Sequence, residues 1–358
     1  MIREPLLLHT LSINMDSITQ IALGAAFGEA TIGHKVGKKG AIWGAILGTL
    51  PDLDIVANLF LDPVASLAAH RSASHAFPVA LLLSPLIALA LRRLHIKDKA
   101  TKGDWTLMVF LVWASHIFID LCTVYGTQIF WPVTDHPFAI DSIFIIDPFY
   151  TLPLVLGVVL ALRKKVGSRR RFWINGAGLI ISTLYLTWGM SAKLFVHSSF
   201  KQGLASRGLQ TEQVMTAPTL MNTVLWQGLA LESDTLHAGL YSLLDDRTSS
   251  SFEAIPRRSH LLSGHREDRA VARLLWFSKG WYSVEEDSLG LTFADYRFGR
   301  SDGWLYGEGT PIFYWRLIPD STGAYTSFRQ LPTMISGRTE AFTKLFERAR
   351  GDWSGFSF

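Results

Sequence analysis

The sequence predicts a polytopic α-helical membrane bundle of about four to six helices, followed by a small β-rich (α+β) soluble domain. The chain of 358 residues is 49% hydrophobic and only 18% charged, against about 25% charged in an average soluble domain, and its mean hydropathy is +0.23. Residues 1–200 hold 8 of the 11 histidines and are poor in charge, whereas residues 201–358 have an ordinary, near-neutral polar composition. We therefore expect an N-terminal extension (1–14), a helical membrane domain (15–200) and a soluble domain (201–358).

Six apolar runs are candidate membrane helices, because a helix needs about 20 mostly apolar residues to cross a bilayer. They cover residues 18–33, 41–61, 76–94, 105–125, 143–162 and 172–192. The first run is short and rich in small residues, and the second carries Asp52 and Asp54. These two runs are therefore candidates for re-entrant or bundle-buried helices as well as for spans.

Basic residues gather in alternate loops and predict the orientation of the helices. The loops after the first, third and fifth runs hold 14 of them: Lys35, Lys38, Lys39, Arg92, Arg93, Lys97, Lys99, Lys102, Arg163, Lys164, Lys165, Arg169, Arg170 and Arg171. The loops after the second and fourth runs hold only Arg71. The positive-inside rule places the basic loops in the cytoplasm. With six spans, the domain after residue 200 is then periplasmic or extracellular.

Histidine and aspartate residues gather at the outward ends of the same runs. They are Asp52 and Asp54 in the second run, His70 and His75 before the third, and His116 and Asp120 in the fourth. A charged residue within a membrane segment costs about 2.5–3.5 kcal/mol on insertion scales and by default marks function. We therefore expect a functional site at the outward membrane face.

The residue types and spacings at this face indicate a metal site. His116 and Asp120 are four residues apart, so both project from one face of a helix. Imidazole and carboxylate ligands without a thiolate suit Zn, with Mn or Fe as alternatives. We predict a divalent transition metal held by the six residues above, with Asp52 and Asp54 as candidate catalytic carboxylates and one of them free as general base. Each motif also has a structural interpretation: a helix break at PDLD, incidental loop histidines, and a hydrogen-bonded His116–Asp120 pair.

The segments that carry these residues resemble the YdjM-like family of bacterial inner-membrane proteins, which are described as metal-dependent hydrolases. The elements are PDLD at 51–54, HRSASH at 70–75 and SHIFID at 115–120. The resemblance covers roughly residues 15–200, and the C-terminal part is similar to longer members. It implies a multi-pass protein of the bacterial inner membrane.

The opening motif of the family, D-x-x-T-H, reads Asp16-Ser-Ile-Thr-Gln20 in this chain. The resemblance therefore implies Asp16 and Gln20 as further residues of the metal site, although Gln20 replaces a histidine and glutamine is not among the usual zinc ligands. The family is in turn similar to zinc-dependent phospholipase C and P1 nuclease, whose His-x3-Asp helix matches His116 and Asp120. That similarity implies hydrolysis of a phosphoester.

The part after residue 201 reads as short antiparallel strands with hairpin turns, for example around 287–290. Residues 340–353 are typical of an amphipathic helix. Asp295 and Arg297 are expected to form a structural salt bridge. Basic residues are balanced by acids here, so nucleic-acid binding is not expected.

The leading hypothesis is a membrane-bound metal-dependent hydrolase that acts on a phosphoester or lipid-linked substrate, with the lipid bilayer as its surroundings. An ion- or proton-coupled transporter is the first alternative, but it predicts polar residues throughout the bilayer depth. A non-catalytic membrane protein with a degenerate metal site is the second, and Gln20 favours it. The sequence carries no signal of oligomeric state.

Overall fold

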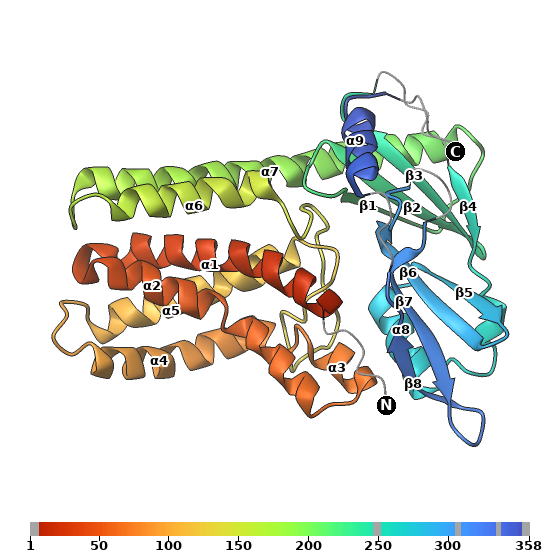
Figure 1. Ribbon diagram of the computed structural model, residues 1–358, viewed down its shortest axis with the longest axis horizontal. Coiled ribbons are helices and arrows are strands. Elements are labelled where there is room, and N and C mark those ends of the chain that lie inside the picture. The colour runs from red at the N-terminus through yellow and green to blue at the C-terminus, as the bar shows by residue number, and fades with distance from the viewer. Residues whose placement is uncertain (1–6, 246–251, 305–308, 334–337, 353–358) are drawn as a thin grey trace. The chain divides into compact units, whose positions relative to one another are not determined.

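The computed structural model describes residues 7–245, 252–304, 309–333 and 338–352 (Figure 1). The chain forms two compact units. The first comprises Met1–Phe60, Ala69–Ile140 and Ile145–Trp188. The second comprises Leu61–Ala68, Asp141–Phe144 and Gly189–Phe358.

The first unit is helical, and all six predicted apolar runs fall on helices. Its helices are α1 (Leu7–Val36), α2 (Lys38–Gly48), η1 (Pro51–Leu59), η2 (Ala73–His75), α4 (Phe77–Leu94), α5 (Lys102–Leu121), α6 (Pro148–Leu162) and the first part of α7 (Arg169–Ala205). Figure 1 shows the long helices of this unit running roughly side by side. The helix α1 begins at Leu7, earlier than the boundary at residue 15 that the sequence predicts.

Among the described residues, three helices are long and apolar enough to cross a membrane: α4, α5 and α7. A fourth span results if α2 and η1, which meet at a bend of 42°, are counted as one. The break falls at Pro51, which starts η1 as a 3-10 helix and cannot donate a backbone hydrogen bond to continue α2. The predicted class, a membrane bundle followed by a β-rich α+β part, is confirmed, with three to four candidate spans.

Facing glycines let α1 and α2 pack with their backbones in close contact. A Cβ atom on Gly28 would lie 2.1 Å from the carbonyl oxygen of Gly40, and one on Gly44 would lie 2.1 Å from that of Gly24. Small residues at such a spacing are typical of tightly packed membrane helices. The packing continues to Gly48, where a Cβ would lie 2.5 Å from the carbonyl oxygen of Gln20. It thereby brings the start of η1 next to the part of α1 that carries Gln20.

The helix α5 forms the centre of the first unit and contacts α1, α2 and α4. Its N-terminus is fixed by a capping box, in which the Asp104 backbone N–H donates to the Thr101 hydroxyl and the Asp104 carboxylate accepts from the Thr101 N–H. Trp105, Met108 and Val112 are fully buried along it. A helix held this firmly gives His116 and Asp120 fixed positions near its C-terminal end.

The second unit contains two four-stranded antiparallel sheets. One is formed in the order β1 (Gln213–Pro218), β2 (Leu225–Glu232), β3 (Thr235–Ser242) and β4 (Glu253–Pro256), and the other in the order β5 (Tyr282–Asp287), β6 (Gly290–Arg300), β7 (Pro311–Pro319) and β8 (Tyr325–Gln330). Its helices are α3 (Pro63–Ala69), the last part of α7, η3 (Ser259–Leu262), α8 (Arg269–Ser278) and α9 (Arg338–Ala349).

Three expectations for this part of the chain are confirmed. Asp287 pairs with Gly290 across a two-residue hairpin turn, and α9 occupies the predicted amphipathic segment. Asp295 and Arg297 form a buried ion pair of 2.6 Å. These residues therefore stabilise the second unit itself.

Candidate metal centre

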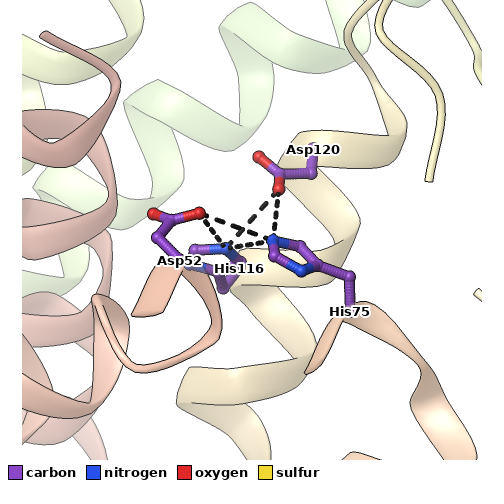
Figure 2. A group of neighbouring side chains, drawn as sticks. All are labelled: Asp52, His75, His116 and Asp120. Atoms are coloured by element: carbon purple, nitrogen blue, oxygen red, sulfur yellow. Dashed lines mark hydrogen bonds and ion pairs between the residues drawn. The ribbon is translucent and has the colours of Figure 1, made fainter. Parts of the chain in front are cut away.

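Four side chains from three segments of the first unit point toward one another (Figure 2). Asp52 comes from η1, His75 from η2, and His116 and Asp120 from α5. One ligand atom of each residue lies within 4.8 Å of the corresponding atoms of the others. These four residues, called the quartet below, have the ligand types and spacing to hold a metal ion.

The distances between the quartet atoms are close to those of a tetrahedral ligand set. The Nε2 atoms of His75 and His116 lie 3.1 Å apart. Asp52 Oδ1 lies 3.5 and 3.4 Å from these two nitrogens, and Asp120 Oδ2 lies 3.1 and 3.5 Å from them. A tetrahedral zinc site with bonds of about 2.0–2.2 Å has ligand–ligand edges of about 3.3–3.6 Å. The five distances that involve a histidine nitrogen are close to these edges, and the sixth, between Asp52 and Asp120, is within 4.8 Å.

Hydrogen bonds at the far side of each imidazole determine which nitrogen faces the centre. His116 Nδ1 lies 2.7 Å from the carbonyl oxygen of Gly48, which only accepts, so Nδ1 carries the proton. His75 Nδ1 lies 2.9 Å from Ser74 Oγ and 3.5 Å from an Asp54 carboxylate oxygen. Both rings thus direct Nε2 toward the quartet, as metal-ligating histidines do when a carbonyl or carboxylate binds the other nitrogen.

The charge around His75 favours a cation at this point. Burial opposes protonation of the His75 imidazole, but its hydrogen bonds to Asp120, Asp52 and Asp54 outweigh burial and raise its pKa well above the usual value. The surrounding carboxylates therefore attract positive charge to the position between the two histidines. A divalent cation there would compensate the buried carboxylate of Asp120 and the half-buried one of Asp52.

Asp54 and His70 lie beside the quartet and pair with each other, at 3.0 Å between Asp54 Oδ1 and His70 Nδ1. Asp54 also accepts hydrogen bonds from the Arg71 backbone N–H at 2.9 Å and from the Ser74 hydroxyl at 3.1 Å. Of the six predicted ligands, the structure brings four together and places these two where they orient His75 and the chain around it.

Gln20 contacts a quartet residue from α1. Its Nε2 donates a 2.9 Å hydrogen bond to Oδ1 of Asp120, and the side chain is fully buried. The bond leaves Oδ2 of Asp120 facing the two histidines. Asp16, the other residue implied by the family motif, lies in α1, but its side chain is outside the described part of the structure.

Arg71 is a residue of the site that sequence reasoning missed. Nε of its buried guanidinium lies 3.3 Å from Oδ2 of Asp120, and Nη1 donates a 2.9 Å hydrogen bond to the hydroxyl of Thr123. It also lies over the ring of Tyr125, 4.9 Å from the centroid. The only signal in the sequence was its place directly after His70, as the single basic residue of the two outward loops.

Three side chains of the quartet are buried, and the fourth, Asp52, is partly exposed. The side chains of His75, His116 and Asp120 are at most 1% exposed, whereas that of Asp52 is 30% exposed. Catalytic metal sites keep one side accessible to water or substrate, whereas structural sites are closed. The accessible side of this site is the one that η1 contributes.

Comparison with known proteins gives one family and one curated relative. Residues 15–196 match the family model described as YdjM inner membrane protein. The chain is 32% identical over 143 residues to a protein of Bacillus subtilis (strain 168) described as uncharacterized protein YfhP. The alignment covers 38% of this chain and 42% of that protein, so the chain spans less than half of the relative's length. No solved structure matches the chain.

Proposed function

Because the chain belongs to the YdjM inner membrane protein family, we propose that it is a membrane-bound metal-dependent hydrolase of phosphoesters, with its site in the first unit. The matched residues 15–196 contain the entire quartet. The three to four apolar helices of the chain agree with a membrane location. The proposal concerns the chemistry that the quartet performs there.

The observation that carries the proposal is the convergence of two Nε2 atoms and two carboxylate oxygens within 4.8 Å of one another. Two nitrogen and two oxygen ligands in this arrangement suit Zn²⁺, with Mn²⁺ or Fe²⁺ as alternatives that usually take more ligands. When bound, the ion would polarise a phosphoryl oxygen and lower the pKa of a nearby water.

The residues of this chain would have different roles at such a site. His75 and His116 hold the ion through Nε2, and Asp120 holds it through Oδ2 while Gln20 and Arg71 keep its carboxylate in place. Asp52 would be the fourth ligand and is the accessible one, so we assign to its side the approach of substrate and water. Asp54 is fully engaged with His70, Arg71 and Ser74, so it acts as a positioning residue. Of the two candidate catalytic carboxylates, Asp52 is therefore the one that lies in the ligand group, and neither is free as a general base.

The phosphoester class rests on the likeness of His116-x3-Asp120 to the zinc-binding helix of phospholipase C and P1 nuclease. The loop charges predict that this end of α5 faces the periplasmic or extracellular side. A site at that level of the membrane suits the phosphate group of a lipid or of a lipid-linked substrate.

Hydrolysis of a chromogenic phosphodiester tests the proposal. Purified protein loaded with Zn²⁺ or Mn²⁺ is expected to hydrolyse bis(p-nitrophenyl) phosphate, and the His116→Ala/Asp120→Ala double variant is expected to lose this activity. Asp135→Ala/His136→Ala is a matched control, because it removes an exposed Asp–His pair from the following loop. Equal activity in the wild type and the quartet variant would contradict the proposal.

A further inference from the structure

The 14 basic loop residues of the first unit lie in and beside three connections, which join α1 to α2, α4 to α5, and α6 to α7. Figure 1 shows these three connections at the same end of the first unit. The quartet residues His116 and Asp120 lie near the other end of α5, about 21 Å or more from Lys102, its first residue. The basic end of the unit is therefore a region separate from the quartet.

Contacts bring the three connections together. Lys39 Nζ lies 2.7 Å from Asp98 Oδ2, so the turn between α1 and α2 is tied to the connection between α4 and α5. A Cβ atom on Gly37, in the same turn, would lie 3.7 Å from Cγ2 of Val166 in the connection between α6 and α7. The orientation of membrane helices requires only that each of these loops is basic, whereas this packing concentrates the charge of all three.

The acidic residues at this end are already paired. The three connections and the helix turns beside them contain Glu29, Asp98 and Asp104. Arg171 Nη2 donates to Glu29 Oε2 at 2.7 Å, and Lys35 Nζ lies 2.7 Å from Asp104 Oδ1. Asp98 pairs with Lys39 as described above. No acidic residue of this end is therefore left to compensate the other basic residues.

Ten of the other basic residues are exposed and have no ion-pair partner in the described part of the chain. They are Lys38, the four lysines and arginines of residues 93–102, and the five of residues 163–170. We call these ten residues the basic surface. Positive charges gathered in this way repel one another, and bound anions reduce the repulsion.

The stability of the helices does not explain this charge. Basic residues in the first turn of a helix oppose its dipole, whereas acidic ones favour it. The helix α2 begins with Lys38 and Lys39, and α7 begins with Arg169 and Arg170. Neither helix has an acidic residue in its first turn. The charge therefore points to a negatively charged partner outside the chain.

Exposed apolar side chains among the basic residues indicate where this partner lies. Leu94 and Ile96, in the connection between α4 and α5, are 66% and 68% exposed. Phe172 and Trp173, in the first turns of α7, are exposed as well. Tryptophan and basic residues at the ends of apolar helices are typical of the membrane–water interface. The basic surface is thus expected at the level of the lipid phosphates, which favours a lipid over a nucleic acid as the partner.

We infer that the basic surface binds the phosphate groups of anionic phospholipids in the leaflet that it faces. Clusters of lysine and arginine directly beside membrane helices attract anionic lipids, and salt weakens such an attraction between exposed charges. Phosphatidylglycerol and cardiolipin carry a net negative charge, whereas phosphatidylethanolamine has no net charge. The lipids bound here are partners rather than substrates, so the inference does not depend on the proposed hydrolase function.

Binding of tail-labelled fluorescent lipids to the full-length protein in non-ionic detergent tests the inference. The probes are phosphatidylglycerol and cardiolipin, with phosphatidylethanolamine as the reference lipid. The wild type is expected to bind both anionic lipids more tightly than the reference. Lys165→Gln/Arg169→Gln/Arg170→Gln is expected to weaken binding of the anionic lipids by roughly tenfold or more, because each basic residue near the lipid contributes to the attraction.

Two further variants show whether positive charge at this place is the cause. Lys201→Gln/Arg266→Gln/Arg329→Gln removes three exposed cations from the second unit and is expected to retain anionic-lipid binding. Lys165→Arg/Arg169→Lys/Arg170→Lys keeps the charge and is expected to bind as the wild type does. Equal loss in the second-unit variant, loss in the charge-retaining variant, or a wild type that binds single-stranded RNA but shows no preference for anionic lipid would overturn the inference.

Salt dependence of the wild type gives a test that needs no variant. Its affinity for phosphatidylglycerol is expected to fall several-fold between about 0.05 and 0.5 M NaCl, while its affinity for phosphatidylethanolamine stays nearly constant. A preference for the anionic lipid that salt leaves unchanged would contradict binding through the basic surface. The metal content of the quartet is expected to be the same in all variants, so the result is independent of the metal site.

Discussion

Gln20 orients the candidate site through one hydrogen bond. Its amide nitrogen donates to Oδ1 of Asp120, so that Oδ2 is left for His75, His116 and Arg71. Arg71 approaches Oδ2 and also anchors the end of α5 at Thr123. Gln20, at the position where the resemblance implies a histidine, therefore orients Asp120, one of the candidate metal ligands.

Removal of the Gln20 amide is expected to weaken metal binding. In Gln20→Ala the buried Oδ1 of Asp120 loses its partner, and loss of such supporting contacts typically lowers metal affinity by about 10–100-fold. Gln20→His is expected to hold metal at least as well as the wild type, because an imidazole supplies a donor or a further ligand. Chelator competition measures both affinities. An unchanged affinity in Gln20→Ala would show that the hydrogen bond does not position Asp120.

The sequence predicted some of these residues better than others for physical reasons. His116 and Asp120 lie on one regular helix, so their spacing alone placed them on a common face. The roles of Asp52 and Asp54 were not separable, because a 3-10 helix turns neighbouring residues to different faces and the sequence indicated no such helix. The Arg71 contact depends on how the loop folds back onto α5, which no local pattern records.

At the scale of elements, the facing glycines of α1 and α2 control how closely η1 approaches α5. Gly48 ends α2, and its carbonyl oxygen accepts from His116. The start of η1, and with it Asp52, follows within a few residues. The position of Asp52 therefore depends on an interface that contains none of the ligands.

Gly28→Ala is expected to disturb both the fold and the site. The added Cβ would lie 2.1 Å from the Gly40 carbonyl oxygen, so the helices must separate, at a cost of about 1–3 kcal/mol. Thermal unfolding in detergent and metal content measure the effect. Gly176→Ala in α7 is the control, because a Cβ there meets no atom within 4 Å. Equal stability of the two variants would contradict the close packing.

An exposed ion pair in the second unit gives an expected pH dependence. Hydrogen bonds from the Arg316 guanidinium, one of them at 2.7 Å, lower the pKa of Asp287 to about 2. The folded-state pKa is below the usual value of 3.8, so this contribution is present above about pH 4 and is lost as the pH falls toward 2. Asp287→Asn is expected to flatten the acid dependence of unfolding of the second unit in this range. Glu286→Gln, at a neighbouring position of β5, is the control, and an identical acid profile in Asp287→Asn would contradict the pairing.

The elements themselves were largely predictable from the sequence. Apolar runs of helical length indicated all six helical regions of the first unit, and alternating strands with a turn at 287–290 indicated the β5–β6 hairpin. For the second run, 41–61, a helix break at PDLD was one of the interpretations, and the chain bends there by 42° between α2 and η1. The bend falls at Pro51, which cannot donate a backbone hydrogen bond to continue α2.

At the scale of the whole molecule, composition predicted the division into a membrane part and a β-rich part. In the structure, residues 61–68 and 141–144 belong to the second unit. The boundary between the two units along the later chain lies at 188–189, within α7. Composition changes smoothly along such a helix, so it gives no boundary there. Short segments between helices carry no periodic signal that would assign them to either unit.

The 14 loop lysines and arginines predict an orientation of the chain in the membrane. With six spans before it, the second unit is expected outside the cytoplasm. Alkaline phosphatase fused at the C-terminus is expected to be active, and green fluorescent protein at the same place is expected to be dark. The reverse pair of results would place the second unit in the cytoplasm and overturn the proposed topology.

The central claim is that Asp52, His75, His116 and Asp120 together hold one divalent transition ion. The most direct measurement is metal content with X-ray absorption on protein purified under zinc-replete conditions. We expect about one ion per chain, with nitrogen and oxygen neighbours at about 2.0–2.2 Å and no sulfur. The bound ion is expected to be lost in His116→Ala/Asp120→Ala and retained in Asp135→Ala/His136→Ala. A wild-type protein without bound metal, or one whose metal survives the quartet variant, would contradict it.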